Sequence, residues 1–142
     1  MLMLDNRIRR LAGEVKRMDT SPLRIVVVDD NELVADAVSA TLEFEGFQSV
    51  PAYSGLDGIA KCQEHEVHAI LLDISMPQCD RFATCRQIRS SAALRNILII
   101  AYTALPPDFV CAHSIPGDFD GYCQKGVPAD ELAMFVASWF AS

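Results

Sequence analysis

Three short apolar runs, each followed by polar side chains, limit what this chain can fold into more than any other feature. The runs cover residues 25–28, 69–72 and 97–101, and they are followed by Asp29 and Asp30, by Asp73, and by Tyr102 and Thr103. Runs of this length are too short for buried helices and are typical of strands that are covered on both faces. A parallel sheet with helices on both sides is therefore expected.

The rest of the chain supports this α/β reading, because strand patterns alternate with helix patterns five times. Turn and cap residues separate the segments, such as Asn31 and Ser54 before helical runs and Gly46 after one. Strands are expected at 24–28, 48–52, 69–73, 97–101 and 121–123, and helices at 31–44, 55–64, 81–89, 105–114 and 128–140. This alternation predicts a doubly wound parallel sheet with right-handed crossovers.

Residues 1–22 differ from the rest of the chain. Apolar side chains recur there at helical spacing, basic side chains lie between them, and a Thr-Ser-Pro sequence ends the pattern at Pro22. We predict an amphipathic helical extension over 1–22 and a domain over 23–142. The extension either lies on the domain or docks a partner or a second copy, since a one-sided apolar stripe must be buried somewhere.

Composition excludes several classes of protein. The net charge of −7 disfavours attraction to nucleic acid or to an anionic membrane. There is no apolar run of membrane-spanning length and no recognisable secretion signal, so we expect a cytoplasmic protein without membrane insertion. The five cysteines include no CxxC pair, and reduced thiols are expected rather than a Cys/His metal site.

The acidic residues that follow the strands predict a phosphoryl-transfer site. The carboxyl ends of parallel strands share one edge of the sheet, so Asp29, Asp30 and Asp73 should converge there. Oxygen-only clusters of this kind suit Mg²⁺, which would relieve the repulsion between the carboxylates. Asp73 would then be a nucleophile that forms an aspartyl phosphate, with Thr103 and Lys125 binding phosphoryl oxygens.

Each of these residues also has a purely structural interpretation when taken alone. A strand-terminal aspartate often caps a helix, as Asp29 and Asp30 could do, and Thr103 could cap the turn that follows it. Lys125 could be a solvated surface charge, and Tyr122 could be half-buried packing on its strand. Their joint order along five strand–helix units favours the site.

Four segments, in the order in which they occur, resemble the receiver domain of two-component response regulators. They are Val28-Asp29-Asp30, Leu72-Asp73-Ile74-Ser75-Met76-Pro77, Tyr102-Thr103-Ala104 and Gly121-Tyr122-Cys123-Gln124-Lys125. The likeness covers residues 23–140. It implies a flavodoxin-like (βα)5 fold with a five-stranded parallel sheet of order 2-1-3-4-5, to which the extra N-terminal helix is added.

The resemblance also implies a role for each matching residue. Asp73 would be the phosphoacceptor, and the Mg²⁺ ligands would be Asp29, Asp30, Asp73 and the backbone carbonyl of Ser75. Thr103 and Lys125 would bind the phosphoryl oxygens. Thr103 and Tyr122 would form the switch pair, in which movement of the threonine lets the tyrosine turn inward.

Implied partners follow from the same likeness. A histidine kinase or a histidine phosphotransfer protein would phosphorylate Asp73 in a phosphorelay, and a downstream protein would bind the face made of the fourth helix, fifth strand and fifth helix. Direct nucleic-acid binding is not expected, because no basic recognition helix is evident. The chemistry would be limited to self-phosphorylation and autodephosphorylation with Mg²⁺. A homodimer stays an open alternative.

The chain departs from the family pattern at three places. Arg81 stands where glycine is usual, Gly126 stands where proline usually follows the lysine, and Pro106, Pro107 and Pro116 bound the fourth helix. These departures motivate a second interpretation, a pseudo-receiver that binds partners without phosphorylation. A phosphohydrolase with Asp73 as nucleophile is a further rival, although Ser75 cannot serve as its general acid. A receiver cut from a longer hybrid protein is another.

Overall fold

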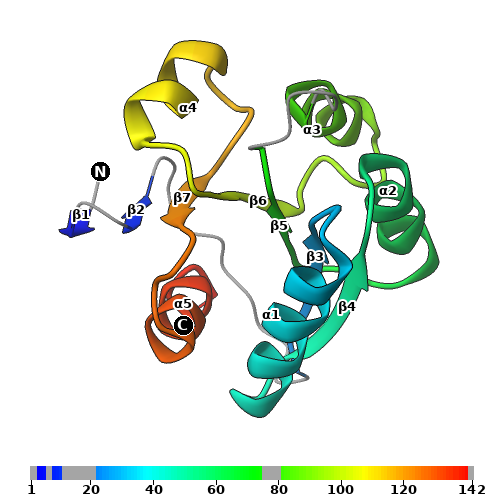
Figure 1. The fold of residues 1–142 in the computed structure, drawn as a ribbon. Helices are drawn as coiled ribbons and strands as arrows, with labels where there is room; N and C mark the ends of the chain where they lie inside the picture. The colour runs from blue at the N-terminus through cyan, green and yellow to red at the C-terminus, as the bar shows by residue number, and fades with distance from the viewer. Residues whose placement is uncertain (1–2, 6–7, 11–21, 75–80, 141–142) are drawn as a thin grey trace.

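A seven-stranded sheet lies between two layers of helices in the computed structural model, which describes residues 3–5, 8–10, 22–74 and 81–140 (Figure 1). The strands are β1 (Met3–Asp5), β2 (Ile8–Arg10), β3 (Arg24–Val28), β4 (Gln48–Ala52), β5 (Ala69–Leu72), β6 (Leu98–Thr103) and β7 (Gly121–Gln124). The helices are α1 (Glu32–Phe44), α2 (Gly55–Glu64), α3 (Arg81–Ser90), α4 (Pro107–His113) and α5 (Ala129–Ser138).

Five of the strands are parallel and lie in the order β4-β3-β5-β6-β7. In chain order of the parallel strands this is 2-1-3-4-5, so the predicted topology is confirmed. The register pairs Val28 with Leu72 and Leu72 with Ala101, which brings the carboxyl ends of β3, β5 and β6 level at one edge. The residues after these strands therefore start from the same edge of the sheet.

Each face of the sheet has its own hydrophobic core. Helices α2, α3 and α4 cover one face, and α1 and α5 cover the other (Figure 1). The central strands β3, β5 and β6 are buried along both faces, since every residue from 69 to 72 and from 98 to 103 is buried. This burial is the reason that their sequences are unbroken apolar runs rather than alternating ones.

Local signals set most of the helix boundaries as expected. The Asn31 side chain accepts a hydrogen bond from Val34 N at the start of α1, and Ser54 Oγ accepts one from Asp57 N at the start of α2. Helix α4 begins at Pro107, two residues later than predicted, because Pro106 precedes a proline and is extended at φ −71° and ψ 158°.

Strand β6 extends two residues further than predicted, to Thr103. The sequence pattern ended the strand at residue 101, where the apolar run gives way to Tyr102 and Thr103. In the structure Tyr102 pairs with Cys123 and Thr103 pairs with Gln124, so the ladder with β7 continues to the last residue. Tyr102 and Thr103 are therefore strand residues, and both side chains are buried.

The predicted N-terminal helix is wrong for the part of the segment that the structure describes. Residues 3–5 and 8–10 are strands, and β2 lies antiparallel to β7, while residues 11–21 lie outside the described residues. Without β2, the parallel sheet would end at β7 with a row of unpaired backbone groups. Pairing satisfies these groups and buries Ile8, and this tertiary gain outweighs the helical spacing of the apolar residues. The boundary at residue 22 stays a prediction.

Gly121, at the start of β7, is where α5 approaches the sheet most closely. A Cβ atom at this residue would lie 2.6 Å from Cη2 of Trp139 and 3.2 Å from Cζ of Phe135. Both aromatic side chains are buried, and their rings pack edge to face at a centroid distance of 4.6 Å. The absence of a side chain at 121 therefore allows the aromatic pair to lie directly on β7.

Gly121→Ala is expected to lower the free energy of unfolding by about 1–3 kcal/mol, because the added methyl group must displace a fully buried indole ring. Urea denaturation at pH 7 measures the change. Ala137→Ser, on the exposed side of α5, is the control and should change stability by less than about 0.5 kcal/mol. An unchanged denaturation midpoint in Gly121→Ala would show that the Trp139 ring leaves room for a methyl group at residue 121.

Candidate functional site

Three carboxylates gather at the carboxyl edge of the sheet. Asp29 directly follows β3 and Asp73 directly follows β5, and both residues are only 2% exposed, whereas Asp30 is exposed. Backbone hydrogen bonds that continue the strand pairing hold the two buried residues. Asp29 N donates to the carbonyl of Ala52, and Asp73 N donates to the carbonyl of Val28. One carboxylate oxygen from each of the three aspartates lies within 4.8 Å of the others.

Lys125 completes this cluster from the end of β7. Its Nζ donates to Oδ2 of Asp29 at 2.6 Å and to Oδ2 of Asp73 at 2.8 Å. The Lys125–Gly126 peptide bond is trans, and Gly126 has a φ of +97°, which a side chain would disfavour. A glycine turn therefore brings the lysine to the two buried carboxylates.

The two carboxylates change the protonation of Lys125. Burial by itself would lower the pKa of the ammonium group, but the hydrogen bonds to Asp29 and Asp73 outweigh burial and raise the pKa above its usual value. The side chain is therefore a cation at neutral pH. It offsets part of the negative charge that three neighbouring carboxylates place at this edge.

The residues present fit a Mg²⁺ ion. The cluster offers oxygen ligands alone, and one of its carboxylates, that of Asp30, is exposed to solvent, which suits an ion that keeps several of its waters. No other group of three or more Asp, Glu, His or Cys side chains within the described ranges could hold a metal. The predicted ligand Ser75 and the other residues from 76 to 80 lie outside the described residues.

Thr103 and Tyr122 are joined through the backbone of Leu105. Thr103 is fully buried, and its Oγ1 accepts a hydrogen bond from Leu105 N at 3.1 Å. Tyr122 is 1% exposed, so it points inward, and its hydroxyl donates to the carbonyl of Leu105 at 2.5 Å. Sequence reasoning proposed the pair but missed Leu105, because a contact through backbone atoms leaves no signature in residue types.

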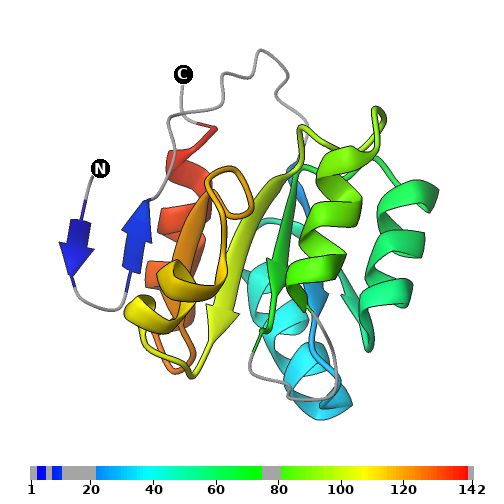
Figure 2. The same cartoon turned by 90° about the horizontal axis from the view of Figure 1, so that it is seen from above.

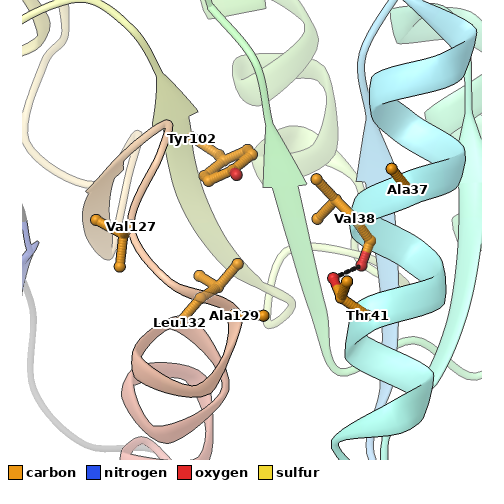
Figure 3. Close-up of a pocket in the computed structure, with 7 residues that line it drawn as sticks. All are labelled: Ala37, Val38, Thr41, Tyr102, Val127, Ala129 and Leu132. Carbon is orange, nitrogen blue, oxygen red and sulfur yellow. Dashed lines mark hydrogen bonds between the residues drawn. The ribbon is translucent and has the colours of Figure 1, made fainter.

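An apolar pocket of about 210 Å³ lies between α1 and α5 on the other face of the sheet (Figure 3). Its lining residues are Ala37, Val38, Thr41, Tyr102, Val127, Ala129 and Leu132. Tyr102 is only 7% exposed, and its hydroxyl has no hydrogen-bond partner among the described residues. Burial raises the pKa of this phenol. Sequence reasoning did not predict this pocket.

The cysteines that the structure describes take no part in the cluster of carboxylates. Burial raises the pKa of Cys62 to about 11 and that of Cys85 to about 12, so both are neutral thiols at physiological pH. Cys111 and Cys123 form no disulfide bond with another described residue, and Cys79 lies outside the described residues. The reduced state of all five cysteines stays a prediction.

A model of the response regulator receiver domain matches residues 25–137. The DNA-binding dual master transcriptional regulator RpaA of Synechocystis is 32% identical over 109 residues, which are 77% of this chain and 45% of that protein. Response regulator MprA of a Mycobacterium species is 33% identical over 111 residues, or 78% of this chain and 47% of its own. The chain thus spans about half the length of these curated relatives.

Solved structures show the same architecture. A CheY-like receiver domain protein from Methanospirillum hungatei is 25% identical, with a TM-score of 0.72 over 83% of this chain and 93% of its own. Chemotaxis protein CheY4 of Vibrio cholerae, at 20% identity, supports the fold alone, with a TM-score of 0.77 over 84% of this chain and 100% of its own. Among the described residues, no helix has the length and apolar character that crossing a bilayer requires.

Lys125→Met should lower the free energy of unfolding by about 1–3 kcal/mol at pH 7, because two buried carboxylates lose their shared cation. A pKa that is raised on folding gives stability that is complete below the unfolded value of 10.5 and is lost above it. The difference between wild type and variant should therefore be constant from pH 7 to 9 and shrink above about pH 10.5.

Urea denaturation across this pH range measures the effect, with Lys61→Met on α2 as the control that removes an ammonium group from another part of the surface. A difference that is small at pH 7, or that grows in alkali, would contradict the assignment of the ion pairs.

Tyr102→Phe should change the free energy of unfolding by less than about 1 kcal/mol, because it removes a hydroxyl that borders the pocket and has no hydrogen-bond partner among the described residues. Thermal denaturation provides the measurement. The control is Tyr53→Phe, which loses the hydrogen bond from Tyr53 Oη to Asp36 Oδ1 at 2.6 Å and should be less stable than wild type. A clear loss of stability in Tyr102→Phe would reveal a partner for this hydroxyl.

Proposed function

The chain belongs to the family of response regulator receiver domains, and from this membership we propose that it is switched by phosphorylation of Asp73. One observation carries the proposal. The Asp73 carboxylate lies in a cluster with those of Asp29 and Asp30, and the ammonium group of Lys125 contacts it at 2.8 Å. A nucleophile, an oxygen-ligand set and a cation are thus present at one edge of the sheet.

The proposed reaction is phosphoryl transfer from a phosphohistidine of a histidine kinase or a histidine phosphotransfer protein. An Asp73 oxygen attacks phosphorus, the P–N bond to the donor histidine breaks, and the imidazole leaves with the electron pair of that bond. Asp29, Asp30 and Asp73 would hold Mg²⁺, with the backbone carbonyl of Ser75 as a further ligand. When bound, the ion supplies positive charge that neutralises the phosphoryl oxygens.

Lys125 and Thr103 are the residues that would hold the transferred group. The Lys125 ammonium already contacts Asp73 Oδ2, and it is close enough to pair with a phosphoryl oxygen on that carboxylate. Thr103 Oγ1 would exchange its contact with Leu105 N for a contact with another phosphoryl oxygen. Each of the two side chains therefore has a contact in this structure that it would trade for one to the phosphate.

The bonds at Leu105 provide a route from the phosphate to the surface. If Thr103 releases Leu105 N, the Leu105 carbonyl that accepts from the Tyr122 hydroxyl is free to shift. Leu105 lies two residues before Pro107, the first residue of α4, so such a shift would reach that helix. Thr103 and Tyr122 would thus form the switch pair. The proposed output is the binding of a downstream protein to the face formed by α4, β7 and α5.

A pseudo-receiver that binds its partner without phosphorylation is the second candidate. The departures from the family pattern at Arg81 and Gly126 favour it, since Gly126 directly follows Lys125 and Arg81 is the first residue of the helix that comes after Asp73. The contacts of Lys125 with both buried carboxylates favour the phosphorylated switch instead. The two functions predict different responses to a phosphoryl donor.

Wild type incubated with acetyl phosphate and Mg²⁺ should gain 80 Da per chain in intact-mass spectrometry, the mass of one phosphoryl group. Asp73→Asn should show no such gain, and chelation of Mg²⁺ should reduce labelling of the wild type strongly. Asp108→Asn, which removes an exposed carboxylate on α4, is the matched control and should label like wild type.

The same experiment separates the alternatives. A wild type that takes up no phosphate, and that shows no change in NMR spectrum with beryllofluoride and Mg²⁺, would favour the pseudo-receiver. Equal labelling of Asp73→Asn would refute Asp73 as the acceptor. Sustained turnover of a phosphomonoester would indicate a phosphohydrolase.

A further inference from the structure

Strand β2 occupies the outer edge of β7, where the five-stranded parallel sheet would otherwise end (Figures 1 and 2). The pairing is antiparallel, with Ile8 opposite Cys123, Arg9 opposite Tyr122 and Arg10 opposite Gly121. All three partners on β7 are buried. The edge of β7 is therefore able to accept an extended segment along three consecutive residues.

The Ile8 side chain anchors β2 to the core. Ile8 is 2% exposed and belongs to the buried cluster on the α5 face, together with Cys123, Phe135 and Trp139. The edge of β7 thus offers two kinds of contact, backbone hydrogen bonds along the strand and an apolar recess for one aliphatic side chain. These are the two elements by which sheet edges bind extended peptides.

The covered edge belongs to the face through which the proposed function would act. Strand β7 lies between α4 and α5, and Arg9 of β2 is paired with Tyr122, the inner member of the proposed switch pair (Figure 1). A protein that engaged the edge of β7 would have to take the place of β2. Within the described residues β2 pairs with β7 along three residues, so few backbone contacts have to break when β2 is displaced.

The charge of β2 complements that of the whole chain. The segment reads Ile-Arg-Arg, whereas the complete chain has a net charge of −7. Two basic residues in an extended segment would therefore be attracted to a chain that is acidic as a whole, and an aliphatic residue before them would fill the recess of Ile8.

We infer that the outer edge of β7 is a strand-docking site that residues 8–10 fill in the isolated chain. A downstream partner binds there by supplying an extended, antiparallel segment with an aliphatic residue at the place of Ile8 and basic residues after it, and so displaces β2. The inference rests on the proposed function only in taking the bound protein to be the downstream partner of the switch. The site itself is defined by the β2–β7 pairing.

A peptide in trans tests the site without any phosphoryl donor. The probe is a fluorescein-labelled peptide with the sequence of residues 3–10, and its binding to the full-length chain is measured by fluorescence anisotropy. Ile8→Asp, which places a charge in the apolar recess, should release β2 and bind the peptide at least about tenfold more tightly than wild type does. The same peptide with aspartate in place of the isoleucine should not bind.

A disulfide bond that can be reduced provides the matched control. Because Ile8 is directly opposite Cys123, Ile8→Cys can form a disulfide bond that fixes β2 on β7. The oxidised variant should not bind the peptide, and reduction with dithiothreitol should restore binding to at least the level of wild type. If Ile8→Asp does not fold by circular dichroism, Arg9→Pro replaces it, since proline removes a backbone donor from β2.

Three results would overturn the inference. The first is no peptide binding by folded Ile8→Asp or Arg9→Pro, and the second is equal binding by the oxidised and reduced forms of Ile8→Cys. The third is equal binding of the isoleucine and aspartate peptides. Failure of the proposed phosphorylation is separate, because it is measured by the mass gain at Asp73 and leaves peptide binding unchanged.

Discussion

The contact of one ammonium group with two buried carboxylates is the interaction on which the organisation of the molecule depends. Asp29 and Asp73 are held at the ends of β3 and β5 by the sheet, and Lys125 reaches both from the end of β7. The contact therefore ties together strands that are far apart in the sequence. It also determines what this edge can do, because a cation that is already in contact with the carboxylates is preorganised for an anionic group bound to one of them.

Most of the fold and the acidic part of the site could be predicted from the sequence, and the reason is local. Fully buried parallel strands must be apolar, so the runs before Asp29 and Asp73 identify both the strands and their functional ends. The N-terminal segment could not be predicted in this way. Its apolar spacing fits a helix, and only the unpaired edge of β7, more than a hundred residues away, makes the strand at Ile8 favourable.

The parts of the site that sequence reasoning missed are contacts that do not depend on residue type. Leu105 joins Thr103 to Tyr122 through its N–H and its carbonyl, and any residue with a free backbone N–H could do the same. The turn that holds Lys125 is similar, since the sequence shows a glycine at 126 but not the left-handed conformation that makes it useful. Such features become visible only when the backbone path is known.

The packing of Trp139 against Gly121 has a practical consequence for spectroscopy. The chain has a single tryptophan, and its indole ring lies against the first residue of β7, shielded from water. Its emission therefore reports on one place only, the junction between the edge strand and the last helix. A shift of β7 relative to α5 would change the quenching or the wavelength of this emission without any added label, so the protein carries its own optical probe of that junction.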